Sequence, residues 1–227
     1  MKTKNFIEIL RAYRNDKVFN PYADKCEIHD KYDAEKIRVK NLTNILESFE
    51  NIGVESIWIG RDLGHRGGRR TGIALTDEAH LHSAKLRWKA SLSQATKGAP
   101  FAERTALNIW SVLNYIEEEI FMWNVFPFHP HEENNSLTNR SHTAKERDDG
   151  IEILSDLIEL LHPKRLVAIG NDAHKCALKI FPSSSTYKVR HPSYGGEKDF
   201  IKQICDLYNI KPSEIEKLGN SQQSLDI

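Results

Sequence analysis

The chain has 227 residues, a hydrophobic fraction of 39%, a charged fraction of 28% and a formal net charge of +0. This size and composition are those of a soluble globular protein with one domain, or one domain and a small appendage. No apolar run is long enough to span a membrane, and the N-terminal sequence MKTKNFIEILRAYRND is too polar for a signal peptide. We therefore expect a cytoplasmic protein.

The cysteines are scattered without paired spacing, which fits a reducing compartment and argues against a zinc or iron–sulfur site. They are Cys26, Cys176 and Cys205. A few residues with ligand-type side chains gather near the first cysteine, but their types and spacing match no standard metal site: Asp24, Cys26, His29 and Asp30. We expect no metal or other cofactor and interpret the thiols as small buried apolar groups.

Residues 1–52 predict an N-terminal helical segment that packs on the core. Apolar residues at helical spacing predict helices over residues 3–14 and 34–51. Between them the chain has no regular period, and the Asn20-Pro21 pair marks a turn.

Residues 53–210 alternate short apolar runs with amphipathic stretches. The apolar runs predict strands at residues 57–59, 120–126 and 165–170, and we expect a fourth, shorter strand at residues 186–190. The amphipathic stretches predict helices at residues 102–118, 143–161, 172–180 and 197–208, the second of which opens with a capping box, Thr143 and Glu146. This alternation predicts an α/β protein, a three-layer α/β/α sandwich with a central four-stranded parallel sheet. Residues 211–227 are polar and are expected to form a C-terminal tail.

A glycine-rich loop follows the first strand of the expected sheet. Residues 56–77 read SIWIGRDLGHRGGRRTGIALTD; beyond Gly60 they contain four more glycines and four arginines, and Asp62 lies close to the strand end. Ligands of α/β domains bind at the carboxyl ends of strands, and glycine lets backbone approach a ligand closely. A solvated strand-to-helix turn is the alternative interpretation.

Polar side chains stand at the ends of three predicted strands: Asp62, Asn124 and His191. In a parallel sheet all three lie at the same edge. A carboxylate, an amide and an imidazole together suit a hydrolysis or the recognition of a polar ligand. Taken singly, Asp62 can cap a turn, Asn124 can satisfy strand-end backbone groups, and His191 can be a core histidine.

The ordered set of these motifs resembles the uracil-DNA glycosylase superfamily, over about residues 54–200. The first motif is GRDLG at residues 60–64 with GIALT at residues 72–76. The second is WNVFP at residues 123–127, followed by Asn139-Arg140. The third is His191-Pro192-Ser193. The three in order are more specific than His-Pro-Ser alone.

The resemblance implies a monofunctional DNA N-glycosylase, a hydrolase that flips a base out of DNA into a pocket. It implies that Asp62 stabilises the cationic sugar and orients or deprotonates the attacking water, and that His191 stabilises charge on the leaving base. It implies base binding by Asn124, Leu75, Gly64 and Gly60. The DNA contacts that we expect involve Ser193, Tyr194, Arg69, Arg70, Asn139 and Arg140. The partner is then DNA, single- or double-stranded; we expect a monomer that does not bind membranes.

Three departures from the family pattern enlarge the expected pocket. Gly64 stands where the best-known uracil-specific branch has a tyrosine that blocks C5-substituted pyrimidines, and Leu75 matches the family's stacking phenylalanine. The loop between them carries Arg69 and Arg70, which are expected to contact DNA phosphate or a polar group on an enlarged base. We therefore predict a pocket for uracil or a C5-modified pyrimidine. Some members of the superfamily that the sequence resembles are similar to repair enzymes, and others are similar to proteins that defend against phage with modified DNA. The missing cysteine ligands exclude the iron–sulfur branch.

Two other functions are compatible with the sequence. A non-catalytic member that binds nucleic acid or a nucleobase is favoured by Leu75 in place of an aromatic residue. A nucleotide-binding α/β hydrolase is the second, because glycine loops at strand ends also bind phosphate. The loop lacks both a Walker lysine-serine pattern and a dinucleotide fingerprint, which argues against it.

Overall fold

The computed structural model describes residues 1–50, 52–211 and 215. The expected C-terminal tail, residues 211–227, therefore lies outside the described residues apart from Lys211 and Ile215. Within the described part of the chain, no helix is both long and apolar enough to cross a membrane.

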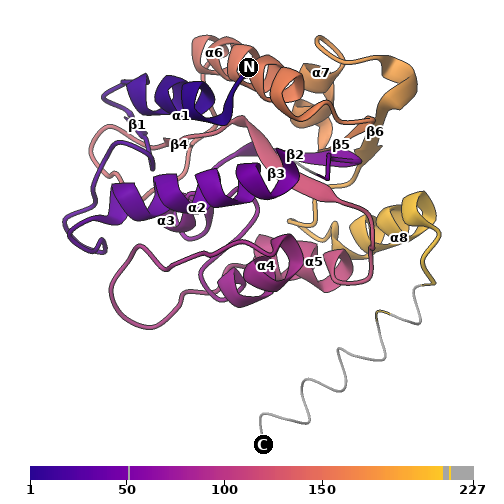
Figure 1. The fold of residues 1–227 in the computed structure, drawn as a ribbon, viewed down its shortest axis with the longest axis horizontal. Coiled ribbons are helices and arrows are strands. Elements are labelled where there is room, and N and C mark those ends of the chain that lie inside the picture. The colour runs from indigo at the N-terminus through magenta and orange to yellow at the C-terminus, as the bar shows by residue number, and fades with distance from the viewer. Residues whose placement is uncertain (51, 212–214, 216–227) are drawn as a thin grey trace, which may run out of the picture.

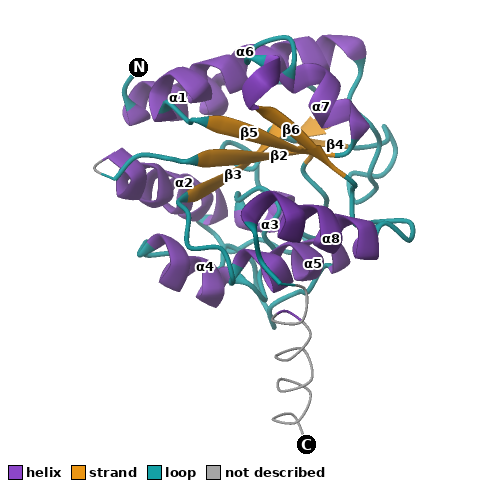
Figure 2. Cartoon of the chain, turned by 90° about the vertical axis from the view of Figure 1, so that its right-hand side faces the viewer, coloured by secondary structure: helices purple, strands orange, loops and turns teal. Residues whose placement is uncertain are grey.

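A four-stranded parallel sheet in the order β3-β2-β5-β6 forms the centre of the molecule, which confirms the predicted fold class (Figures 1 and 2). Its strands are β2 (Ser56–Asp62), β3 (Ile120–Phe126), β5 (Arg165–Ile169) and β6 (Thr186–Val189). Sheets covered on both faces have near-continuous apolar strands, which is why these runs were predictable. A small antiparallel pair, β1 (Val18–Phe19) with β4 (His129–Pro130), was not predicted.

Helices cover both faces of the sheet. In both views α1, α6 and α7 lie on one face and α4, α5 and α8 on the other, while α2 runs beside β3 (Figures 1 and 2). The helices are α1 (Thr3–Ala12), α2 (Ala34–Glu50), α3 (Gly68–Thr71), α4 (Leu81–Trp88), α5 (Arg104–Leu113), α6 (Ala144–Leu161), α7 (Asn171–Ala177) and α8 (Glu197–Tyr208), with a short 3-10 helix η1 (Ser183–Ser185).

Several helices differ from the prediction. Helices α3 and α4 were not predicted, because α3 has only four residues and α4 is short and buries only Leu81, Ala84 and Trp88. Helix α5 ends at Leu113 rather than at residue 118. The Arg87 guanidinium explains the early end, because it donates to the carbonyls of Leu113, Ile116 and Glu118 at 2.7–2.9 Å. These carbonyls therefore have hydrogen-bond donors without a further helical turn.

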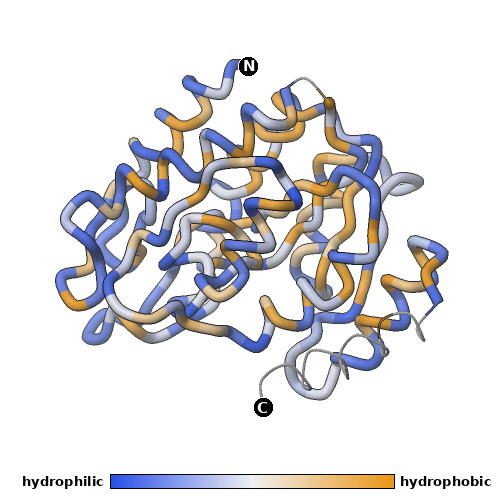
Figure 3. Tube along the Cα trace, turned by 60° about the horizontal axis from the view of Figure 1, so that its bottom comes forward, coloured by the Kyte–Doolittle hydropathy of each residue, from blue (hydrophilic) through white to orange (hydrophobic). Residues whose placement is uncertain are grey.

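The hydrophobic segments run through the interior and the outer turns are mostly hydrophilic (Figure 3). Three tryptophan side chains are almost completely buried: Trp58 in β2, Trp123 in β3 and Trp110 in α5. All three cysteines are buried as well. Burial of this kind is the main favourable term in folding.

The N-terminal segment holds the glycine-rich loop in place. Arg38 is fully buried, pairs with Asp30 and donates to the Arg70 carbonyl at 3.2 Å. The Tyr22 hydroxyl donates to the Gly72 carbonyl at 3.0 Å. Gly72 has φ +72°, and a Cβ there would lie 2.7 Å from Cβ of Arg38. Only glycine combines this left-handed backbone with so close an approach.

Candidate active site

Asn124, Gly60 and Leu75 meet at the carboxyl ends of β2 and β3. Gly60 opposes Asn124 in the strand register. A Cβ on Gly60 would lie 2.3 Å from Oδ1 of Asn124 and 3.1 Å from Cδ2 of Leu75, so the missing side chain is what makes room for both. Among the described residues, Oδ1 of Asn124 is buried without a hydrogen-bond partner. Such an atom costs about 1–3 kcal/mol, and a ligand that donates a hydrogen bond would remove that cost.

Leu75 adopts a backbone conformation that is rare for its residue type. Its φ is +56°, and its side chain is packed partly against the core. A non-glycine residue in this region costs on the order of 1–3 kcal/mol, and such residues cluster at ligand sites. Leu75 is therefore held beside Asn124 by its surroundings rather than by its own backbone preference.

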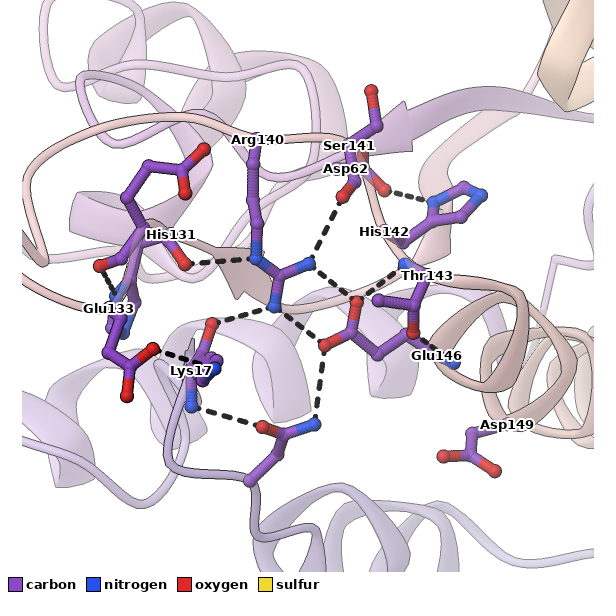
Figure 4. Close-up of polar contacts among 12 residues, drawn as sticks. Lys17, Asp62, His131, Glu133, Arg140, Ser141, His142, Thr143, Glu146 and Asp149 are labelled. Atoms are coloured by element: carbon purple, nitrogen blue, oxygen red, sulfur yellow. Dashed lines mark hydrogen bonds and ion pairs between the residues drawn. The ribbon is translucent and has the colours of Figure 1, made fainter.

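Asp62 is the last residue of β2, and both of its carboxylate oxygens have partners. Oδ1 contacts Nδ1 of His142 (Figure 4). Oδ2 accepts from Nε of Arg61 at 2.7 Å. The Asp62 side chain is 7% exposed, whereas that of Arg61 is 44% exposed. Arg61 also lies 3.6 Å from Oδ2 of Asp172 in α7. A carboxylate at a strand end that is held by one exposed and one buried partner is suited to acid–base chemistry.

His191 lies two residues beyond β6 and above Gly170, whose Cβ would be 3.5 Å from Cβ of His191. The Ser193 N–H donates to Nδ1 of His191 at 3.1 Å, which leaves the proton of the neutral ring on Nε2. Burial lowers the pKa of His191, and the charges of Arg61 and Arg190 lower it further. His191 is therefore a neutral Nε2–H donor near pH 7.

Gly64 faces open space, because a Cβ built on it meets nothing within 4 Å. The loop around it is fixed from the side: Oδ1 of Asn139 accepts from the N–H of His65 at 3.0 Å and lies 3.1 Å from Nε2 of His129. Asn139, predicted to contact DNA, thus supports the loop that carries Gly64.

Tyr194 projects from the turn that follows His191. Its side chain is 99% exposed and its φ is +53°. Ser193, the preceding residue, is half-buried, with its hydroxyl 3.5 Å from that of Thr105. An exposed aromatic ring on a strained turn is a costly feature for a monomer surface, and it is a candidate contact for a ligand.

The three arginines predicted to contact DNA form hydrogen bonds with groups of the protein itself. Arg69 is 4% exposed; it donates to the Ser136 carbonyl and to Nδ1 of His129 at 3.2 Å. Burial lowers the pKa of His129 to about 3, so this ring is neutral and can accept. The prediction of a DNA contact by Arg69 does not fit this placement, and loop sequence alone did not reveal the burial.

Arg70 and Arg140 are also committed to internal partners. Arg70 donates to Glu78 and to Thr96, both at 2.9 Å. Arg140 binds both carboxylate oxygens of Glu146 at 2.7 Å, and its remaining N–H groups go to backbone carbonyls (Figure 4). Both side chains therefore have structural roles, and their DNA contacts stay a prediction.

The site also contains residues that the sequence had not singled out. His142, the partner of Asp62, lies in the loop before α6, and nothing in its local sequence distinguished it. Three exposed arginines act electrostatically on histidines of these loops: Arg61 and Arg190 on His191, and Arg66 on His65. The basic composition of residues 61–70 had indicated this face, but exposure decides which side chains are free.

A separate groove lies at the opposite end of the sheet. It is lined by Ser83, Leu86, Arg87, Asn114, Ile116, Glu117 and Glu119. The last of these residues precede β3 directly, so this groove is at the amino end of the strands and does not belong to the site described above.

Comparisons with known proteins give a family and a fold. The sequence model described as "Uracil DNA glycosylase superfamily" matches residues 88–205, just over half of the chain. The match spans Asn124 and His191 but begins after Asp62. No curated protein matches the sequence. The crystal structure of wild-type SMUG2 from Pedobacter heparinus is similar, with a TM-score of 0.55 at 14% sequence identity over 99% of this chain and 97% of that one.

Proposed function

Because this chain belongs to the uracil DNA glycosylase superfamily, we propose that it is a monofunctional DNA glycosylase that releases uracil or a C5-substituted pyrimidine. Water adds to C1′ of the deoxyribose, the bond from C1′ to the base nitrogen breaks, and the base leaves with the bonding electrons. The observation that carries the proposal is the buried Oδ1 of Asn124, which has no hydrogen-bond partner in the described part of the chain and lies at the same sheet edge as Asp62 and His191. No lysine occurs in the three motifs, so strand cleavage through a Schiff base is not expected.

Asn124 is the proposed base-reading residue. An amide can both accept and donate, so it matches the neighbouring N–H and carbonyl of a uracil ring. The base must leave the DNA stack to reach it. Leu75 would then contact the face of the flipped base, and Gly60 would allow the base edge to approach the strand.

Asp62 and His191 are the proposed catalytic residues. The carboxylate stabilises positive charge on the sugar and orients the water, or accepts its proton. The Nε2–H of neutral His191 donates to the carbonyl oxygen on which the leaving base gathers negative charge; one preorganised donor of this kind is typically worth about 3 kcal/mol. The lowered pKa of His191 favours this neutral form.

Gly64 is the proposed specificity position. The open space at its Cβ leaves room beside the base for a substituent on C5. A protein with this pocket would act in DNA repair or in defence against phage with modified DNA, and the identity of its preferred base would separate the two roles.

Replacing Gly60 by alanine tests the base-reading role of Asn124 directly. The new Cβ would meet Oδ1 of Asn124 at 2.3 Å, so the amide must move. We expect base release by Gly60→Ala to fall by about 10- to 100-fold, the cost of one mispositioned polar contact. Gly64→Ala is the matched control, since its Cβ meets nothing. Equal rates for the two variants, measured under single-turnover conditions, would contradict the assignment.

The DNA backbone is proposed to lie across the half-buried Ser193 and the exposed residues Tyr194, Arg66 and Arg190, with Tyr194 filling the gap left by the flipped base. We expect each of Arg66→Gln and Arg190→Gln to weaken DNA binding and to reduce the slope of log K against log salt by about 1. Binding is best measured in an Asp62→Asn background, where the DNA stays intact. Lys164→Gln, exposed at the opposite end of the sheet, should leave the slope unchanged; an unchanged slope in all three would argue against this DNA path.

A non-catalytic DNA- or nucleobase-binding protein is the second candidate. It is favoured by Leu75 in place of an aromatic residue and by the partners that already occupy both oxygens of Asp62. One experiment separates the two: incubation with DNA containing uracil, thymine or C5-substituted pyrimidines, in single- and double-stranded form, followed by mass spectrometry of free bases. Release of a pyrimidine supports the glycosylase. Binding of the same DNA without release supports the second candidate.

A further inference from the structure

Asp62 has a buried partner outside the three sequence motifs. Nδ1 of His142 contacts Oδ1 of Asp62, and the two side chains are 9% and 7% exposed (Figure 4). We infer that His142 is a positioning residue: it donates a hydrogen bond to Oδ1 and so holds the plane of the Asp62 carboxylate towards the attacking water. This inference rests on the proposed glycosylase function.

The backbone on either side of His142 is firmly anchored. Thr143 caps helix α6 and forms a reciprocal capping box with Glu146. Arg140 closes the other side by binding both oxygens of Glu146. Burial opposes the charge of Glu146, yet the hydrogen bonds from Arg140 and from Thr143 lower its pKa. Because residues on both sides are tied to the first turn of α6, His142 has little freedom to leave Asp62.

The ring of His142 is also oriented by packing. It meets the ring of Phe126 edge-on, with the ring centroids 6.2 Å apart. Phe126 is the residue that opposes Asp62 in the register of β2 and β3. The same strand pairing therefore places the carboxylate and the surface against which its imidazole partner packs.

Holding a carboxylate in this way has a chemical consequence. Each oxygen of an ionised carboxylate has two acceptor sites. His142 takes one site on Oδ1 and Arg61 takes one on Oδ2, so a site on each oxygen is left for water or substrate. Arg61 is 44% exposed and can rotate away, whereas His142 is enclosed. His142 is thus the partner that sets the carboxylate's orientation throughout the reaction.

Substitution of His142 separates this role from simple packing. His142→Leu keeps apolar contact with Phe126 but has no donor. His142→Asn places an amide nitrogen at the same number of bonds from Cβ as Nδ1. We expect His142→Leu to slow single-turnover base release by about 10- to 100-fold, the effect of one charge-assisted hydrogen bond, with little change in DNA affinity. His142→Asn should recover most of the rate. His131→Asn is the matched control, because His131 lies in the same loop and its ring Nδ1 contacts the neighbouring Glu132 carbonyl, not Asp62.

A double variant tests whether His142 acts through Asp62. In an Asp62→Asn background, His142→Leu should cause no further loss, because a residue that acts only through Asp62 has nothing left to position. If His142→Leu does not fold, His142→Phe, which keeps an aromatic ring against Phe126 but has no donor, takes its place. Full activity of the Leu or Phe variant, or an equal further loss in the Asp62→Asn background, would overturn the positioning role alone. Absence of base release from the wild-type protein would overturn the proposed function and this inference together.

Discussion

Asp62→Asn is expected to lower the rate of base release by about 10²- to 10⁴-fold, the usual contribution of a positioned acid–base group, while DNA binding survives. The amide has nearly the shape of the carboxylate but carries no charge to stabilise the sugar and cannot accept a proton from water. Rates from single-turnover assays and dissociation constants from the same labelled DNA separate catalysis from binding.

Two further variants make this test specific. Asp172→Asn is the matched control, because Asp172 also faces Arg61, at 3.6 Å, but is exposed at the start of α7; it should retain its activity. His191→Ala should lose about 10²- to 10³-fold by removing the donor to the leaving base. Full activity of both Asp62→Asn and His191→Ala would refute the catalytic assignment.

Gly64→Tyr is expected to convert a broad pocket into one that accepts uracil and rejects C5-substituted pyrimidines by about 10²-fold or more, the scale on which pocket shape discriminates. The position tolerates a side chain: its backbone is outside the left-handed region and its Cβ would meet no atom within 4 Å. The phenol ring would then occupy the space beside C5 of the base.

The measurement is a comparison of kcat/KM for matched DNAs that carry uracil or a C5-substituted pyrimidine. Gly64→Ala, which adds one methyl group in open space, should leave the ratio close to that of the wild-type protein. If the wild-type protein releases only unsubstituted uracil, or if Gly64→Tyr leaves the ratio unchanged, the space at Gly64 does not set the substrate.

Much of the architecture was predictable because its signals are local. Three of the four core strands contain apolar runs, and Thr143 with Glu146 marks the start of α6 in the sequence and in the structure alike. Helix α4 was missed because its three buried residues are spread among polar ones. The end of α5 was misplaced because it depends on Arg87, which comes from a different helix.

The candidate site was predictable in its outline for a similar reason. Parallel strands bring their carboxyl ends to one edge whatever the loops do, so Asp62 and Asn124 were expected to be neighbours, and the register pairs Asn124 with Gly60. The DNA-contacting arginines were harder. Arg69 and Arg140 have the same side chain as Arg66, but their burial and internal partners differ.

By itself, the sequence determined the α/β alternation, the strand-end residues Asp62, Asn124 and His191, and the absence of a side chain at Gly64. Each of these depends only on residue type and on position along the chain. Only the tertiary structure decided that His142 holds Asp62 and that Arg69 supports a loop instead of facing solvent. The reason is physical: a hydrogen bond between residues 80 positions apart, or the burial of a charge against a distant carbonyl, depends on how separate elements pack, and no local pattern records it.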